Sequence, residues 1–181
     1  MNIFQVIVKV EEEEFWKNLL YLSLGIESKT FIYLGESGTF EMSKNCVING
    51  LSSDCLKGLM EPFLECGQLI RSLGRAQWDP NAGLVHNTLV TQLQNSLQFH
   101  QLIVEEITKP RRSLTAASTK MKKLLKTLQL LHRLWSWDAS GKGRGIAFLQ
   151  HLVHLATETI DDENRQLLTA IFAACVQPFL T

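Results

Sequence analysis

The chain has 181 residues, of which 45% are hydrophobic and 20% are charged, and its 18 basic residues balance its 18 acidic ones. This composition is typical of a globular protein that can bury a sizeable core, and it excludes a disordered chain. The neutral balance gives no global field for nucleic acid or anionic lipid, and no apolar run approaches the roughly 18 residues of a membrane span.

The N-terminal segment predicts a helix that begins with acidic residues. Residues 1–14, MNIFQVIVKVEEEE, include an apolar patch but lack the basic region and cleavage site of a secretory signal. The four glutamates at 11–14 precede FWKNLLYLSL at 15–24, and acidic side chains are favourable at the positive end of a helix dipole. We interpret them as a solvated helix start in preference to a metal site or a surface for a basic partner.

One strand-like region follows this helix. FIYL at 31–34, the turn GESG at 35–38 and TFEM at 39–42 predict a β-hairpin, and residues 46–48 offer a third short strand. So small a unit is not stable alone, and we expect it to pack on the helices.

A second helix is expected to begin near Ser53 or Asp54, either of which suits an N-cap, and to end at Gly74. Its apolar positions recur at helical spacing and are Leu56, Leu59, Met60, Phe63, Ile70 and Leu73. Pro62 lies inside this pattern and predicts either a kink or a later start.

The helix expected over 84–107 is unusual, because residues 81–104 contain no Asp, Glu, Lys or Arg. Its apolar residues, which occupy roughly half of the helix circumference, are Leu84, Val85, Leu89, Leu93, Leu97, Phe99, Leu102, Ile103, Val104 and Ile107. The other side carries Asn87, Gln94, Gln98 and Gln101. Neutral amides lose less on desolvation than charges do. We therefore predict that this side lies against a neighbouring helix of the chain or against a partner.

Three further helices complete the pattern. One is expected over 114–135, after a loop at 109–113 that contains Pro110. The next presents Ile146, Leu149, Val153, Ala156 and Ile160 on one face. Asp161 or Asp162 then caps a last helix that stops at Pro178. The sequence thus predicts a mostly α fold, a single region 1–181 forming a bundle of about six helices with a small N-terminal β-hairpin.

No constellation of residues predicts catalysis, a cofactor or a metal. GKGRG at 141–145 lacks the spacing and the preceding strand of a phosphate-binding loop, and no nucleophile elbow is present. His151, His154 and Glu158 share a helix, but we favour surface histidines over a metal site because no fourth ligand is evident. The four cysteines lack metal-site spacing and are expected to be small buried hydrophobes.

Two surface features suggest partners. Residues 109–126 carry seven basic and no acidic residues, so they form a solvated face by default, an acidic-partner surface next, and a nucleic-acid surface third. Trp137, just past a helix beside Arg133, is expected to be partly exposed, and Trp and Arg are enriched at interface hot spots. We list Arg133 and Trp137 with the four amides as candidate partner-binding residues.

The order of the segments resembles the N-terminal conserved domain of the gamma-tubulin complex proteins. The segments are LLYLSLGIESKTF (19–31), LKGLMEPFLECGQLIRSL (56–73), AGLVHNTLVTQLQNSLQFHQLIV (82–104), KMKKLLKTLQLLHRLW (120–135), GIAFLQHLVHLATETID (145–161) and LLTAIFAACVQPFLT (167–181). The "GLV" helix at 82–104 carries most of the resemblance. Within the family, this helix and the hairpin are most similar to the sixth component, with the fifth next.

The resemblance implies a non-enzymatic helical module, without cofactor, that associates laterally with other gamma-tubulin complex proteins in a ring. Such a ring templates microtubule nucleation at the centrosome, the spindle pole and other microtubule-organising centres of the cytoplasm. The family binds gamma-tubulin through a C-terminal domain, which we expect this chain to lack. Contact with gamma-tubulin is then only indirect, and no nucleic acid or membrane is expected as a partner.

Overall fold

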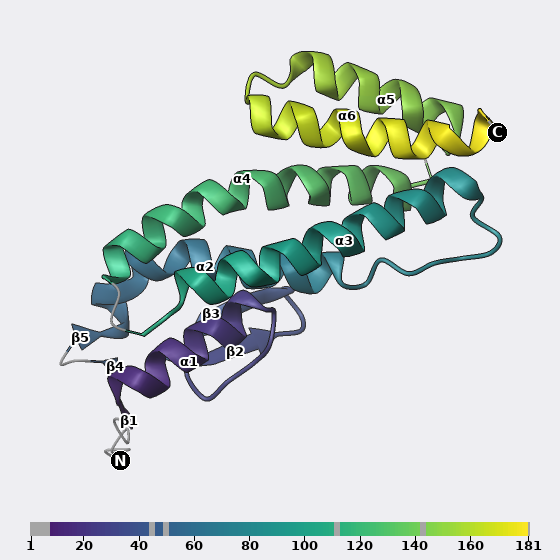
Figure 1. Cartoon of the computed structure of the whole chain (residues 1–181). Helices are drawn as coiled ribbons and strands as arrows, with labels where there is room; N and C mark the ends of the chain where they lie inside the picture. The colour runs from purple at the N-terminus through teal and green to yellow at the C-terminus, as the bar shows by residue number, and fades with distance from the viewer. Residues whose placement is uncertain (1–7, 44–45, 49–50, 111–112, 142–143, 181) are drawn as a thin grey trace. The chain divides into compact units, whose positions relative to one another are not determined.

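The computed structural model describes residues 8–43, 46–48, 51–110, 113–141 and 144–180. Within them the chain forms six α-helices and a small amount of β-structure near the N-terminus, which confirms the predicted fold class (Figure 1). The elements are β1 (Val8–Val10), α1 (Glu12–Ser23), β2 (Phe31–Leu34), β3 (Thr39–Met42), β4 (Cys46–Ile48), β5 (Leu51–Ser52), α2 (Ser53–Leu73), α3 (Leu84–Ile107), α4 (Leu114–Ala139), α5 (Ile146–Glu158), α6 (Asp162–Val176) and a short 3₁₀ turn, η1 (Gln177–Phe179). In the described part of the chain, none of the helices is long and apolar enough to cross a membrane.

The contacts divide the chain into two compact units. The first comprises residues 1–71 and 99–128, and the second comprises residues 72–98 and 129–181. Most of α2 therefore belongs to the first unit, while α3 and α4 each contribute a segment to both. The prediction of a single region 1–181 stays a prediction.

The core of the first unit begins with the contact between α1 and α2. The predicted acidic helix start is confirmed, with Glu12 to Glu14 in the first turn of α1 and exposed. The buried apolar side chains of these two helices are Phe15, Trp16, Leu19 and Leu22 of α1 and Leu56, Met60, Phe63, Cys66 and Ile70 of α2. At Gly67 the backbones approach so closely that a Cβ atom there would lie 2.2 Å from the Leu22 carbonyl oxygen. Hydrophobic burial and a glycine contact together fix α1 on α2.

The predicted hairpin is confirmed and packs on this helix pair. Strands β2 and β3 are antiparallel, with Leu34 opposite Thr39 at the turn end. Arg71 of α2 places its guanidinium 4.0 Å from the Tyr33 ring centroid and donates a hydrogen bond of 3.1 Å to the Gly25 carbonyl. A cation–π contact and a hydrogen bond from one side chain thus join α2 to the hairpin and to the turn before it.

Residues 46–48 do form a third short strand, but not with the hairpin. Strand β4 pairs in parallel with β1 and antiparallel with β5, in a separate sheet with the order β1-β4-β5. Strand β1 was not predicted. Its three residues are too few to show an alternation of apolar and polar side chains, and its partner strand lies far along the chain.

Helix α2 begins at Ser53 and continues through Pro62, so the alternative of a later start is wrong. A proline removes one backbone hydrogen bond, but Pro62 is buried and so adds to the apolar face of the helix. Burial along the rest of the face therefore outweighs one missing bond.

In the second unit, α5 and α6 run side by side as a helical hairpin (Figure 1). Asp161 caps α6 as predicted, because its carboxylate accepts a 2.9 Å hydrogen bond from the Asn164 backbone N–H. The predicted inward face of α5 is wrong. The buried residues are Phe148, Leu152 and Leu155, whereas Ile146, Val153 and Ile160 are exposed. Helix α5 is apolar on more than one side, so periodicity could not decide which side is covered.

Candidate interaction surfaces

The amide side of α3 is exposed. Gln94 and Gln98 in the second unit and Gln101 in the first unit are all exposed. The prediction that a helix of this chain covers them is therefore wrong, and the alternative of a partner remains. Asn87 has a different role, because its side chain accepts from the Asp79 N–H and donates to the Asp79 carbonyl, each at 2.9 Å. It fixes the turn before α3.

Two large apolar residues of α3 are also exposed. Phe99 and Leu102, in the first unit, have 62% and 64% of their surface exposed, and Leu84 in the second unit is exposed as well. The prediction that these three belong to the core face is wrong, because the buried stripe of α3 is narrower than half its circumference. His100 is buried in their place. An uncharged exposed helix surface with large apolar residues is a common form of docking surface.

Arg133 is exposed, whereas Trp137 is partly buried against α5. The Trp137 and His151 rings stack with centroids 3.9 Å apart and planes inclined by 8°. The Trp137 Nε1 atom is buried and finds no hydrogen-bond acceptor in the described residues. Burial, followed by the neighbouring Arg133 and His154 side chains, lowers the pKa of His151.

The alternative of a metal site at His151, His154 and Glu158 gains no support. His154 Nε2 lies 3.4 Å from a Glu158 carboxylate oxygen, and both side chains are largely exposed. His151 is stacked on Trp137 instead. Across the part of the chain that the structure describes, no three His, Cys, Asp or Glu side chains are grouped so that they could hold a metal ion.

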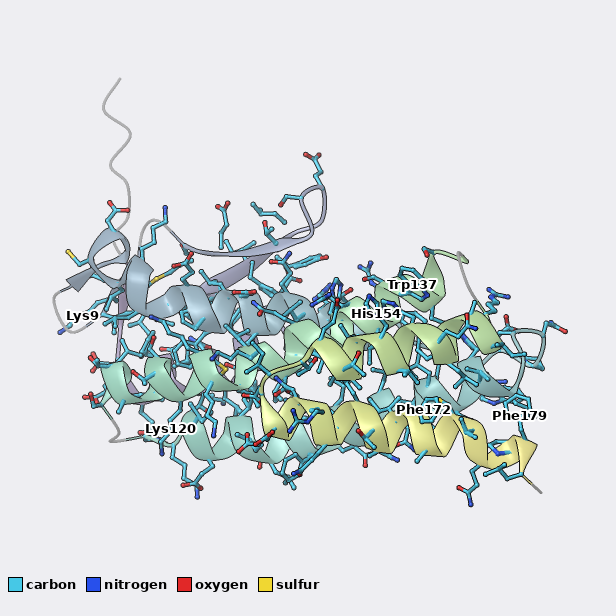
Figure 2. All side chains as sticks on the ribbon, turned by 90° about the horizontal axis from the view of Figure 1, so that it is seen from above. Lys9, Lys120, Trp137, His154, Phe172 and Phe179 are labelled. Atoms are coloured by element: carbon cyan, nitrogen blue, oxygen red, sulfur yellow. The ribbon has the colours of Figure 1, made fainter. Side chains whose placement is uncertain are left out.

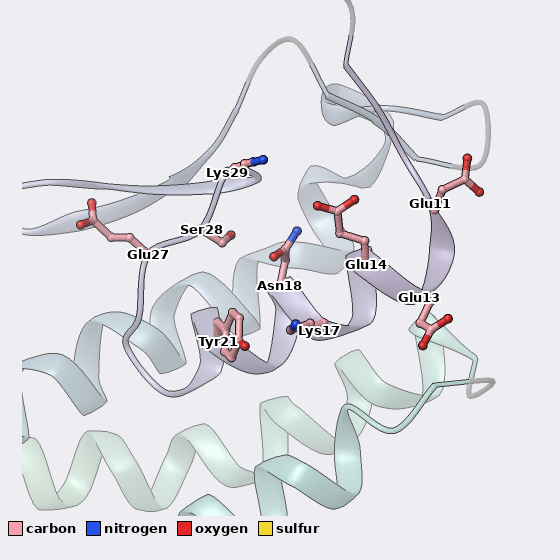
Figure 3. Close-up of a pocket in the computed structure, with 9 residues that line it drawn as sticks. All are labelled: Glu11, Glu13, Glu14, Lys17, Asn18, Tyr21, Glu27, Ser28 and Lys29. Atoms are coloured by element: carbon pink, nitrogen blue, oxygen red, sulfur yellow. The ribbon is translucent and has the colours of Figure 1, made fainter.

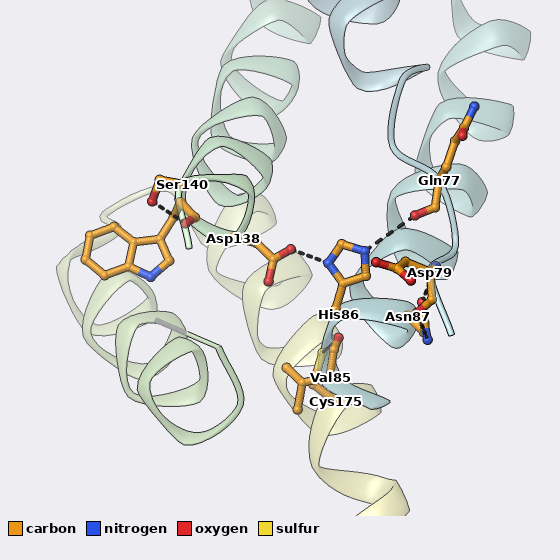
Figure 4. A network of polar contacts seen from close by, with 9 residues as sticks. Gln77, Asp79, Val85, His86, Asn87, Asp138, Ser140 and Cys175 are labelled. Atoms are coloured by element: carbon orange, nitrogen blue, oxygen red, sulfur yellow. Dashed lines mark hydrogen bonds and ion pairs between the residues drawn. The ribbon is translucent and has the colours of Figure 1, made fainter. Parts of the chain in front are cut away.

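A buried histidine–carboxylate pair, which was not predicted from the sequence, joins α3 to α4 in the second unit (Figure 4). His86 Nδ1 lies 2.5 Å from an Asp138 carboxylate oxygen, and the two residues are only 8% and 1% exposed. The other ring nitrogen lies 3.4 Å from the Gln77 carbonyl. These residues are 52 positions apart, so no local pattern could have revealed the pair. Because both side chains are buried, the pair has a structural role.

The basic stretch at 109–126 is exposed where it is described. Lys120, Lys122 and Lys126 are exposed on α4 and make no ion pair with another described residue, while Lys109 is paired with Glu106. Arg111 and Arg112 lie outside the described residues, as do Lys142 and Gly143 of the GKGRG segment. Lys120 extends outward from α4 (Figure 2). The default interpretation of a solvated face fits this exposure.

The acidic start of α1 borders a surface pocket of about 580 Å³ in the first unit (Figure 3). Its lining residues are Glu11, Glu13, Glu14, Lys17, Asn18, Tyr21, Glu27, Ser28 and Lys29. Asn18, the buried member, donates a 2.9 Å hydrogen bond to the Thr30 hydroxyl. The charged side chains are exposed, so the pocket is an open, mixed-charge surface.

The three cysteines whose side chains the structure describes divide into two classes. Cys66 and Cys175 are buried, as predicted, and burial raises the pKa of their thiols to about 12 and about 11, respectively. Protonated, buried thiols are poor nucleophiles. Cys55 is exposed, so the prediction is wrong for that residue.

Comparison with known proteins identifies a family and two relatives that match nearly the whole chain. Residues 17–181 match the family described as "Gamma tubulin complex component N-terminal". The chain is 25% identical over 188 residues to gamma-tubulin complex component 6 of Mus musculus, a match that covers 95% of the chain and 11% of the relative. It is 23% identical over 189 residues to gamma-tubulin complex component 6 of Homo sapiens, covering 95% and 10%. The predicted resemblance is confirmed, and the chain spans about a tenth of the length of these relatives.

Proposed function

Since this chain belongs to the gamma tubulin complex component N-terminal family, we propose that it is a non-catalytic assembly module of a gamma-tubulin complex. In this role it contacts other complex components side by side and supports microtubule nucleation through these contacts. Its site of action is then the cytoplasmic cytoskeleton, at the centrosome, the spindle pole and other microtubule-organising centres. The observation that carries the proposal is the match to the family over nearly the whole chain.

The exposed side of α3 is the surface that we assign to the neighbouring component. Gln94 and Gln98 can hydrogen-bond with a partner and cost less to desolvate than charged side chains. Phe99 and Leu102 offer apolar area of the kind that is buried at the centre of protein interfaces. Arg133 and Trp137 are proposed as additional contacts, whereas Asn87 acts through the turn at Asp79.

The Gln94→Lys and Gln98→Lys double variant should retain a neighbouring component at least about tenfold less well than the unchanged chain, because two ammonium groups must be desolvated at the contact. The measurement is retention of each purified gamma-tubulin complex component, in turn, on the immobilised chain. Gln166→Lys, which changes an exposed glutamine on α6, is the matched control and should bind normally. Circular dichroism spectra should be unchanged in both variants.

Each outcome of this experiment has a distinct meaning. Retention of no component by the unchanged chain contradicts the proposed function. Equal retention of the double variant contradicts the assignment of the contact to the amide side of α3.

A second candidate is favoured by the exposed lysines of α4. Lys120, Lys122 and Lys126, which make no ion pair within the described chain, could bind an acidic protein segment or, less favourably, nucleic acid. No aromatic side chain interleaves with them for base stacking. Salt-dependent binding of an acidic peptide or of random oligonucleotides, abolished by Lys122→Glu with Lys126→Glu, would support this candidate in place of the first.

A further inference from the structure

Helix α5 has a second apolar face that the described residues of the second unit leave partly exposed, with Leu149 and Ala156 half-buried and Ile146 and Val153 exposed. Its inner face is buried through Phe148, Leu152 and Leu155. A separate stripe of Ile146, Leu149, Val153 and Ala156 recurs at spacings of three, four and three residues. Ile146 is 74% exposed and Val153 is 47% exposed. This spacing is the a/d pattern of a two-helix coiled-coil seam, which requires an opposing helix to bury it.

A groove of about 320 Å³ between α5 and α6 continues this stripe. Its lining residues are Leu152, Val153, Ala156, Thr157, Arg165, Thr169 and Phe172. The Thr157 and Thr169 hydroxyls donate to the backbone carbonyls of His154 and Arg165, so the one hydrogen that each can donate is already used within its own helix. The Arg165 guanidinium is paired with Asp162. The groove therefore suits the apolar side chains of another helix.

The charges at the two ends of α5 indicate how that helix runs. Arg144, just before α5, and Glu158, its last residue, are both exposed. Each has the sign that is unfavourable for the dipole of α5 itself, because a helix favours acids at its start and bases at its end. Asp161 and Asp162 add further exposed negative charge beyond Glu158. An antiparallel helix with the same charges would place its acidic end beside Arg144 and its basic end beside Glu158.

We propose that the occupant of this surface is a second copy of the chain, whose α5 lies antiparallel on the α5 stripe. Ile146 of one copy then packs beside Ala156 of the other, and Leu149 packs beside Val153, so each layer joins an a position to a d position. Both seam and end charges are self-complementary under a two-fold axis, as an isologous contact requires. A parallel pair would bring like charges together. The stripe uses residues of α5 that have no part in the proposed α3 contact, so the inference does not rest on the proposed function.

The test is sedimentation velocity of the full chain over a range of concentrations. The unchanged chain should form a dimer, and Val153→Lys should raise its dissociation constant by about tenfold or more, because a buried ammonium at the seam lacks a partner. Ile32→Lys is the matched control, since Ile32 is a β-branched residue of nearly equal exposure, 46%, on the hairpin. Both variants should keep the circular dichroism spectrum and melting temperature of the unchanged chain.

Charge exchange tests the antiparallel orientation. Arg144→Glu alone and the double variant Glu158→Lys with Asp162→Lys should each dimerise more weakly, and an equimolar mixture of the two should form a heterodimer with strength restored. A monomer at all concentrations, or a dimer unaffected by Val153→Lys, would overturn the proposal. Absence of rescue in the mixture would overturn the antiparallel pairing of two copies.

Discussion

Gly67→Ala is expected to lower the free energy of unfolding by about 3 kcal/mol, the upper end of the cost of overpacking a core. In an exposed helix, alanine is better than glycine by roughly 1 kcal/mol, so the expected effect has the opposite sign to the intrinsic preference. The reason is the approach of α1, since the new Cβ atom would lie 2.2 Å from the Leu22 carbonyl oxygen. Leu22 is fully buried, so its backbone has little freedom to move away.

Gly58 provides the matched control on the same helix. Apart from the neighbouring residues and the backbone of its own helix, no described atom lies within 4 Å of a Cβ atom built at this exposed position. Gly58→Ala should therefore stabilise by about 0.5–1 kcal/mol. Urea unfolding followed by circular dichroism measures both variants. If the two substitutions changed stability in the same direction, the close contact of α1 with α2 would be wrong.

Asp138→Ala is expected to lower the free energy of unfolding by about 3–5 kcal/mol, because it leaves His86 buried without its partner. The comparison is Glu158→Ala, which removes a carboxylate from the exposed His154–Glu158 pair and should cost less than about 1 kcal/mol. Both variants delete the acid of a histidine–carboxylate pair, so the difference between them isolates burial. Urea unfolding of the two proteins provides the measurement.

A double-mutant cycle sharpens this comparison. His86→Ala and Asp138→Ala together should cost less than the sum of the single changes, because neither group is then left alone in the interior. Additive effects, or a cost at Asp138 no larger than that at Glu158, would contradict a coupled buried pair.

The helices could be predicted from sequence because each carries an apolar stripe at helical spacing with a recognisable start or end. The Glu11–Glu14 run at the start of α1 and the Asp161 cap of α6 are such signals. Periodicity states that an apolar face exists, but not which of several faces is covered. The face of α5 that was predicted to lie in the core is therefore the partly exposed one, with Ile146 and Val153 exposed.

The contacts that hold distant segments together could not be predicted. Three of them join residues that no local sequence pattern links. They are the β1–β4 strand pair, the His86–Asp138 pair and the stack of Trp137 on His151. The candidate surface was predicted in part. The amides of α3 were identified, and Gln94, Gln98 and Gln101 are exposed, but Asn87 has a partner within the chain.

The most direct test of whether the chain assembles with a gamma-tubulin complex is co-sedimentation. The tagged chain, expressed in cells, is fractionated on a sucrose gradient together with the endogenous gamma-tubulin complex. We expect the chain to migrate in the heavy fractions with gamma-tubulin and the other complex components. A chain that remains entirely in the light fractions, while the complex sediments intact, would contradict the assignment as an assembly module.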